Sequence, residues 1–203
     1  MEENNWDNLI KHPDYEINIK NMNLMIKDGV FTPDPKITNS ALIIINNLPK
    51  VKDLDVLDVG CGTGIIGIYC ALKGAKNVLA VDNSDKALEN TRINLKKNNL
   101  KDRVKVVKSN LFENVNGKFD YIFANLPILD EVWDLDVSTT NTVQKYILEC
   151  KDYVKKGGKV YFTWASFSDI TPLRELCSKL DYSYKEISEN KSGITWYLIE
   201  LSF

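Results

Sequence analysis

A short segment, Asp58-Val-Gly-Cys-Gly-Thr-Gly64, combines one carboxylate with three glycines and lies between the apolar stretches 54–59 and 65–72. Glycine has no Cβ, so it adopts positive φ readily and lets main-chain N–H groups approach a ligand closely. A glycine-dense turn between a strand and a helix is therefore typical of a nucleotide-cofactor site. The acid at its start favours a cofactor that carries a free ammonium group.

The register of the glycines distinguishes two cofactor classes that share their spacing. Gly62, Gly64 and Gly67 have the G-x-G-x-x-G spacing of dinucleotide sites. In that pattern the first glycine should end the first strand, but here that glycine is Gly60, which leaves Ile65 where the third glycine belongs. The register therefore favours S-adenosylmethionine and disfavours a nicotinamide oxidoreductase.

Polar residues also follow three later apolar stretches that are predicted to be strands: Asp82, Asn110 and Asn125. In open parallel sheets, ligands bind outside the carboxyl ends of the strands. We therefore expect these three side chains to complete one pocket with the glycine turn.

These motifs resemble those of class I S-adenosylmethionine-dependent methyltransferases, and in particular the methyltransferase small-domain group. The resemblance implies that Asp82 binds the ribose hydroxyls and that Asn110 accepts from the adenine amino group. Phe123-Ala-Asn125-Leu-Pro127-Ile128 resembles the Asn-Pro-Pro-aromatic motif of amino-group methyltransferases. The cofactor-binding residues that the resemblance implies are Phe31, Thr32, Asp58, Gly60, Cys61, Gly62, Thr63, Gly64, Asp82, Asn83, Asn110, Leu111 and Asn125.

Asn125, Leu126 and Pro127 are the predicted catalytic residues. Methyl transfer needs a nitrogen lone pair aimed at the methyl carbon, so positioning supplies much of the acceleration. The side-chain oxygen of Asn125 and the main-chain carbonyl of Leu126 can accept the two hydrogens of an amine or amide and favour its pyramidal geometry. Pro127 stiffens the strand exit and removes a competing donor.

The same motif departs from the family pattern, because Leu126 and Ile128 stand where a second proline and an aromatic residue are usual. The flat platform for the acceptor is therefore missing, and Trp133 is a candidate replacement. This departure keeps open a second class of function, a non-catalytic S-adenosylmethionine-binding accessory subunit.

The charge of the chain indicates which class of methyl acceptor is favoured. The loop 130–136 carries four acidic residues, and the formal net charge is -2 with a sequence pI near 5.6. An acidic wall repels a phosphate backbone, so a protein side chain or a small amine or amide is the favoured acceptor. RNA or DNA exocyclic-amine methylation remains the alternative; its best support is the basic stretch 96–108, which we interpret as a solvated face.

Alternating strand and helix patterns predict an α/β fold with a Rossmann-like, doubly wound, seven-stranded sheet. The strands are expected at 55–59, 77–81, 104–107, 119–124, 159–164, 182–188 and 194–201. The last two are separated by only residues 189–193, too few for a crossover helix, so they should form an antiparallel hairpin on a mostly parallel sheet.

Local signals place several helix ends. Ser84 is a predicted N-cap, Asp85 adds a favourable charge, and Asn98-Asn99 ends that helix. Another helix is predicted over residues 143–154, with Gly157-Gly158 as a break before the next strand.

The 203 residues suit a single domain. Residues 1–50 are expected to pack as an N-terminal extension, with a first helix over 36–48, on a methyltransferase domain formed by 51–203. The stretch Val30-Phe31-Thr32-Pro33 resembles the segment that closes over the cofactor in release-factor glutamine methyltransferases and ribosomal-RNA guanine methyltransferases.

The polar start of the chain and the absence of a long apolar run predict a cytoplasmic protein. The four cysteines form no C-x-x-C pair, so we expect reduced thiols and neither a metal site nor disulfides. The sequence indicates no particular oligomeric state.

Overall fold

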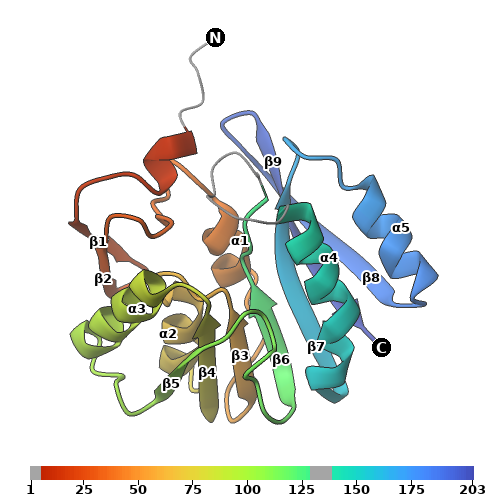
Figure 1. The fold of residues 1–203 in the computed structure, drawn as a ribbon, viewed down its shortest axis with the longest axis horizontal. Coiled ribbons are helices and arrows are strands. Elements are labelled where there is room, and N and C mark those ends of the chain that lie inside the picture. Colours follow the sequence, from red (N-terminus) through yellow and green to blue (C-terminus); the bar gives the residue numbers. More distant parts are fainter. Residues whose placement is uncertain (1–5, 129–138) are drawn as a thin grey trace.

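A seven-stranded sheet forms the centre of the computed structural model, which describes residues 6–128 and 139–203 (Figure 1). The strand order is β5-β4-β3-β6-β7-β9-β8, with the order reversing beside β3. Within this sheet, β3 to β7 are parallel, and β8 and β9 form an antiparallel hairpin that pairs with β7, as predicted. The strands are β3 (Asp55–Val59), β4 (Asn77–Asp82), β5 (Val104–Lys108), β6 (Phe119–Ala124), β7 (Val154–Ala165), β8 (Ser183–Lys191) and β9 (Ile194–Ser202).

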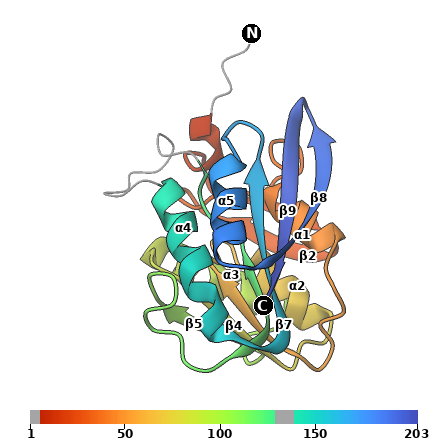
Figure 2. The same cartoon turned by 90° about the vertical axis from the view of Figure 1, so that its right-hand side faces the viewer.

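Helices cover both faces of this sheet. The helices α2 (Ile65–Leu72) and α3 (Asp85–Lys97), which connect parallel strands, lie on one face, where α1 (Ser40–Asn46) also packs. On the other face, α4 (Thr139–Glu149) packs against α5 (Thr171–Lys179) (Figure 2). The Ser84 side chain accepts from the Ala87 N–H and caps α3, as predicted.

Before the main sheet, β1 (Tyr15–Ile19) and β2 (Met22–Ile26) form a separate antiparallel hairpin that packs on α3. Lys20 and Asn21 both have positive φ, which suits a two-residue hairpin turn. A short 3₁₀ helix, η1 (Trp6–Leu9), precedes the hairpin. The chain then returns through residues 29–39 toward the carboxyl ends of the central strands.

The predicted helix over 36–48 is too long. Asp34 accepts through its main-chain oxygen from the N–H groups of Ile37 and Thr38, so these residues form a turn. Helix α1 begins only at Ser40, whose N–H donates to the Thr38 hydroxyl.

The predicted break at Gly157-Gly158 is also wrong, because both glycines lie inside β7. The register with β6 shifts between Phe119 and Tyr121, and the glycine pair lies in that irregularity. The helix predicted over 143–154 ends earlier, at Glu149, and continues as the 3₁₀ helix η3 (Cys150–Tyr153).

The four cysteines are buried and free. Within residues 6–128 and 139–203, no helix is long and apolar enough to cross a membrane. The same ranges hold no cluster of three potential metal-ligating side chains. The acidic loop 130–136 and Trp133 lie outside the described residues.

Candidate cofactor and acceptor site

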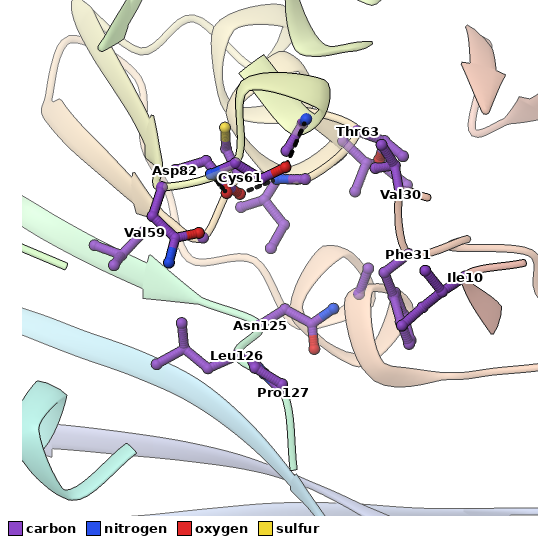
Figure 3. Close-up of a pocket in the computed structure, with 18 of the residues that line it drawn as sticks. Ile10, Val30, Phe31, Val59, Cys61, Thr63, Asp82, Asn125, Leu126 and Pro127 are labelled. Carbon is purple, nitrogen blue, oxygen red and sulfur yellow. Dashed lines mark hydrogen bonds between the residues drawn. The ribbon is translucent and has the colours of Figure 1, made fainter. Parts of the chain in front are cut away.

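A pocket of about 460 Å³ opens at the carboxyl ends of the central strands. Figure 3 shows Cys61, Thr63 and Asp82 on one side of it and Asn125 on another, with Phe31 across from Asn125. The volume falls within the range of small-molecule and cofactor sites. The pocket lies beside the reversal of strand order, where doubly wound sheets bind ligands.

The glycine turn leads from β3 into α2 and is fixed to the end of β4. The N–H groups of Gly60 and Cys61 both donate to the Val81 oxygen, at 2.9 and 3.0 Å. Gly60 has φ of +70° and Gly64 has φ of +79°, and a Cβ on either would lie 2.9 Å from a side-chain carbon, of Leu126 and Thr91 respectively. Glycine is thus required at both positions by conformation and by space.

Asp82 holds two neighbouring segments in place at the edge of the pocket. Its carboxylate accepts from the Gly62 N–H and the Ser84 N–H, each at 2.9 Å, so it fixes both the glycine turn and the start of α3. It also lines the pocket. Burial raises the pKa of Asp82, and the backbone N–H groups oppose that shift. Each carboxylate oxygen keeps a second acceptor site for a ligand hydroxyl.

Asp58 is fully buried behind the turn and does not line the pocket. Its Oδ2 accepts from the Gly67 N–H at 2.9 Å, whereas Oδ1 has no hydrogen-bond partner among the described residues. Burial raises the pKa of Asp58 to about 7, and the nearby Asp82 adds to the shift. A buried carboxylate oxygen without a donor costs free energy, so this oxygen suits a cofactor that brings an ammonium group.

Asn110 lies at the mouth of the pocket with an exposed side chain. Its Nδ2 donates to Glu113 at 2.9 Å, which orients the amide and leaves its oxygen able to accept. The next residue, Leu111, has φ of +49° and is buried.

Asn125 is held by two hydroxyl groups from distant parts of the chain. Its Nδ2 donates to Ser40 Oγ at 3.1 Å, and its Oδ1 accepts from Thr163 Oγ1 at 2.8 Å. Ser40 begins α1, and Thr163 lies in β7, the strand beside β6. Both hydroxyl-bearing residues are buried. The amide oxygen keeps one lone pair for another donor.

Most of the residues predicted from the sequence come together here, and three do not line the pocket: Thr32, Asp58 and Gly64. Thr32 is fully buried, and its hydroxyl bonds to Tyr15 and to the Asp34 N–H. The predicted residues that line the pocket are Phe31, Gly60, Cys61, Gly62, Thr63, Asp82, Asn83, Asn110, Leu111, Asn125, Leu126 and Pro127.

The sequence reasoning missed part of the wall that comes from the N-terminal segment. Val30 and Pro33 line the pocket beside Phe31 and belong to the stretch that the resemblance places over the cofactor. Ile10, Lys11 and Gly29 also line the pocket, and no motif or spacing in the sequence indicated them.

Three comparisons with known proteins agree with this geometry. A sequence model of the methyltransferase small domain matches residues 21–193. A Methanocaldococcus jannaschii protein, whose provisional name is protein N5-glutamine methyltransferase, is 34% identical over 176 residues, which cover 81% of this chain and 85% of that protein. The ribosomal protein uL3 glutamine methyltransferase of Francisella tularensis is 33% identical over 72% of this chain and 53% of its own length.

Among solved structures, the ribosomal protein L11 methylase of Lactobacillus delbrueckii has a TM-score of 0.67 and 25% identity, covering 86% of this chain and 82% of that one. The present chain therefore spans most of the first relative and of this structure, but only about half of the uL3 enzyme.

Proposed function

The chain belongs to the methyltransferase small-domain family and is an S-adenosylmethionine-dependent methyltransferase, and we propose that it methylates the side-chain amide nitrogen of a glutamine in a protein. The observation that carries the proposal is the held amide of Asn125 in a pocket of cofactor size. A glutamine amide presents two N–H hydrogens, which match the Asn125 oxygen and the Leu126 main-chain oxygen. The names of two relatives support the same acceptor.

The pocket residues fit the cofactor. In our proposal the glycine turn approaches its amino-acid end, and the negative charge of Asp58, buried behind the turn, attracts the ammonium group. The second acceptor sites of Asp82 take the ribose hydroxyls, and the oxygen of Asn110 takes the adenine amine. Val30 and Phe31 cover the cofactor from the N-terminal side.

When bound, S-adenosylmethionine supplies a sulfonium-bound methyl group that accepts a nucleophile's electron pair. Asn125 and the Leu126 carbonyl hold the two amide hydrogens, which favours pyramidal nitrogen and directs its lone pair at the methyl carbon. The new N–C bond forms as the S–C bond breaks, and the nitrogen then loses a proton to solvent. No described side chain is assigned as a base, because both contacts to the acceptor are from neutral oxygens.

Ribosomal protein L11 methylation is the second candidate, supported by the solved methylase of similar fold. The glutamine proposal has the broader support, since its first relative matches 81% of this chain at 34% identity. Nucleic acid stays disfavoured because the formal net charge is -2. We also propose that the chain divides at residue 50 into an N-terminal extension, which supplies one wall of the pocket, and a methyltransferase domain.

The test is transfer of a radiolabelled methyl group from S-adenosylmethionine to a cell extract that is then separated into protein, RNA and small molecules. We expect the label in protein. Alkaline hydrolysis should then release it as volatile methylamine, because it cleaves an N-methyl amide, whereas a methyl group on a lysine amine stays with the amino acid. Label in RNA would contradict the proposal, and non-volatile label in protein would contradict glutamine as the acceptor.

The variant Asn125→Ala tests the catalytic role of this residue. It should bind S-adenosylhomocysteine in calorimetry about as well as the wild type, yet transfer methyl groups at least about 100-fold more slowly. A variant that transfers at the full rate would contradict the role of Asn125, while leaving the cofactor assignment intact.

A further inference from the structure

Three asparagines spaced four residues apart, two in α3 and one directly after its last residue, all bond to the main chain of β2. Asn90 accepts from the Lys27 N–H at 3.0 Å and donates to the Met25 oxygen at 2.7 Å. Asn98 accepts from the Asn23 N–H at 3.1 Å and donates to its oxygen at 2.8 Å. Four residues of a helix rise about 6.0 Å and two residues of a strand about 6.7 Å, so every fourth side chain along α3 can meet every second residue along β2.

Asn94, the central member, differs from the other two. It accepts from the Met25 N–H at 2.7 Å, and its Nδ2 donates both to the Met25 oxygen and to the Thr63 oxygen, each at 2.9 Å. Thr63 belongs to the glycine turn. One fully buried amide thus connects the N-terminal hairpin to the glycine turn.

Thr91 holds the same turn one residue earlier. Its hydroxyl donates to the Gly62 oxygen at 2.9 Å, and its methyl group lies against Gly64, where an added Cβ would approach it to 2.9 Å. Thr91 is also fully buried. The carbonyl groups of two successive turn residues are therefore directed toward α3.

The hydrogen bond from Thr91 to the Gly62 carbonyl also fixes the direction of the N–H group that follows it in the turn. In a trans peptide, the carbonyl of one residue and the N–H of the next point in opposite directions, and no cis peptide bond occurs among the described residues. With the Gly62 carbonyl held by Thr91, the Thr63 N–H points away from α3, and Thr63 lines the pocket. Asp82 holds the Gly62 N–H, so the turn is fixed from both sides.

We propose that Thr91 and Asn94 are positioning residues for the cofactor: Thr91 directs the Thr63 N–H at it, and Asn94 makes the turn and the N-terminal hairpin one binding unit. The proposal rests on the cofactor site described above. Neither residue lines the pocket, so both act through the main chain of the turn. Spacing rules for glycine turns would not identify them.

The first test is calorimetric titration of S-adenosylhomocysteine into Thr91→Val and Thr91→Ser. Valine keeps the shape and removes the donor to Gly62, so we expect affinity to fall about fivefold. Serine keeps the donor and should restore most of the affinity. Binding of Thr91→Val at the wild-type affinity would contradict the role of Thr91.

The second test compares Asn94→Ala with Asn90→Ala, which is its matched control. Both asparagines are fully buried in one helix and bond to β2, but only Asn94 bonds to the turn. Both variants should unfold at lower urea concentration, whereas only Asn94→Ala should bind the cofactor more weakly, by about tenfold. Equal losses of affinity in the two variants would overturn the link and leave only a shared effect of hairpin docking.

The wild-type titration separates this proposal from the function itself. If the wild type binds neither S-adenosylmethionine nor S-adenosylhomocysteine, the cofactor site is wrong, and the positioning roles fall with it. If the wild type binds and the variants bind equally well, only the positioning roles are wrong.

Discussion

The side-chain amide of Asn125 receives one hydrogen bond and gives another, and each bond fixes a different half of the group. Thr163 donates to its oxygen, and Ser40 accepts from its nitrogen. Ser40 is itself joined to the Thr38 hydroxyl at 3.2 Å. A buried network whose members are all bonded holds a single arrangement, so the acceptor meets an amide that is already oriented.

Thr163→Val should therefore slow methyl transfer without weakening cofactor binding. Valine retains the branched shape but removes the donor that fixes the Asn125 oxygen, and we expect kcat to fall about tenfold. Thr163→Ser should recover most of the rate. Transfer of labelled methyl to the protein fraction measures the rate, and calorimetry with S-adenosylhomocysteine checks binding. In the Asn125→Ala background, Thr163→Val should add no further loss; a full additional loss would show that Thr163 acts elsewhere.

Asp58 gives a pH dependence of stability. Its pKa is raised from 3.8 to about 7 in the folded protein by burial. At a pH below both values the carboxyl is protonated in both states, so burial imposes no penalty. As pH rises from about 4 to about 7, the unfolded chain loses this proton first, and the folded state becomes relatively less stable.

Asp58→Asn removes this ionisation while keeping an oxygen that can accept from the Gly67 N–H. The variant should gain stability relative to the wild type as pH rises from 4 to 8, as measured by urea unfolding at pH 4, 6 and 8. It should also bind S-adenosylmethionine more weakly at pH 8, because the counter-charge for the ammonium group is gone. A stability difference that does not change with pH would show that Asp58 ionises normally.

Sequence reasoning identified the site residues at strand ends. It did not identify the residues whose hydrogen bonds hold the site in place. Asp82 and Asn125 each come at or directly after a strand end, so chain order alone brings them to one edge of the sheet. Their supporting groups are remote: Asn125 and Ser40 are 85 residues apart, and Asn94 and Thr63 are 31 apart. Only the packing of α1 and α3 creates those contacts, and no local spacing encodes it.

At the scale of elements, the seven-stranded, mostly parallel sheet and its antiparallel ending followed from the sequence, whereas the start of β7 did not. A glycine pair after a helix predicts a stop, because glycine adopts left-handed conformations easily. Here Gly157 has φ of +78° but lies within the strand. Gly158 is needed for space, since an added Cβ would lie 2.5 Å from the Asp120 oxygen.

These two glycines should respond differently to alanine. Gly157→Ala meets no atom within 4 Å and carries only the cost of positive φ, about 1 kcal/mol. Gly158→Ala drives a methyl group into the main chain of β6 and should cost more, about 3 kcal/mol. Thermal unfolding of both variants measures the difference. Equal losses would mean that β7 moves away from β6 without penalty.

Viewed as a whole molecule, two units that are separate in secondary structure share one pocket. The two-stranded hairpin β1–β2 pairs with no strand of the main sheet, yet the segment that follows it supplies Val30 and Phe31 to the pocket. The asparagine row of α3 fixes the hairpin, and Asn94 extends that contact to the glycine turn. Ligand binding at the turn should therefore stabilise the hairpin against opening.

Hydrogen exchange with and without S-adenosylhomocysteine tests this coupling. Binding at one site stabilises any element whose opening disrupts that site, by about 2.7 kcal/mol at a ligand concentration of 100 times Kd. The Met25 and Lys27 amides, which donate to Asn94 and Asn90, should exchange more slowly in the complex. The β8–β9 pairing lies at the far edge of the sheet and should change less. In Asn94→Ala the extra protection that saturating ligand gives to the hairpin should shrink, because the connection to Thr63 is gone. An undiminished ligand-induced gain in that variant would mean that the hairpin responds to the cofactor through Val30 and Phe31 alone.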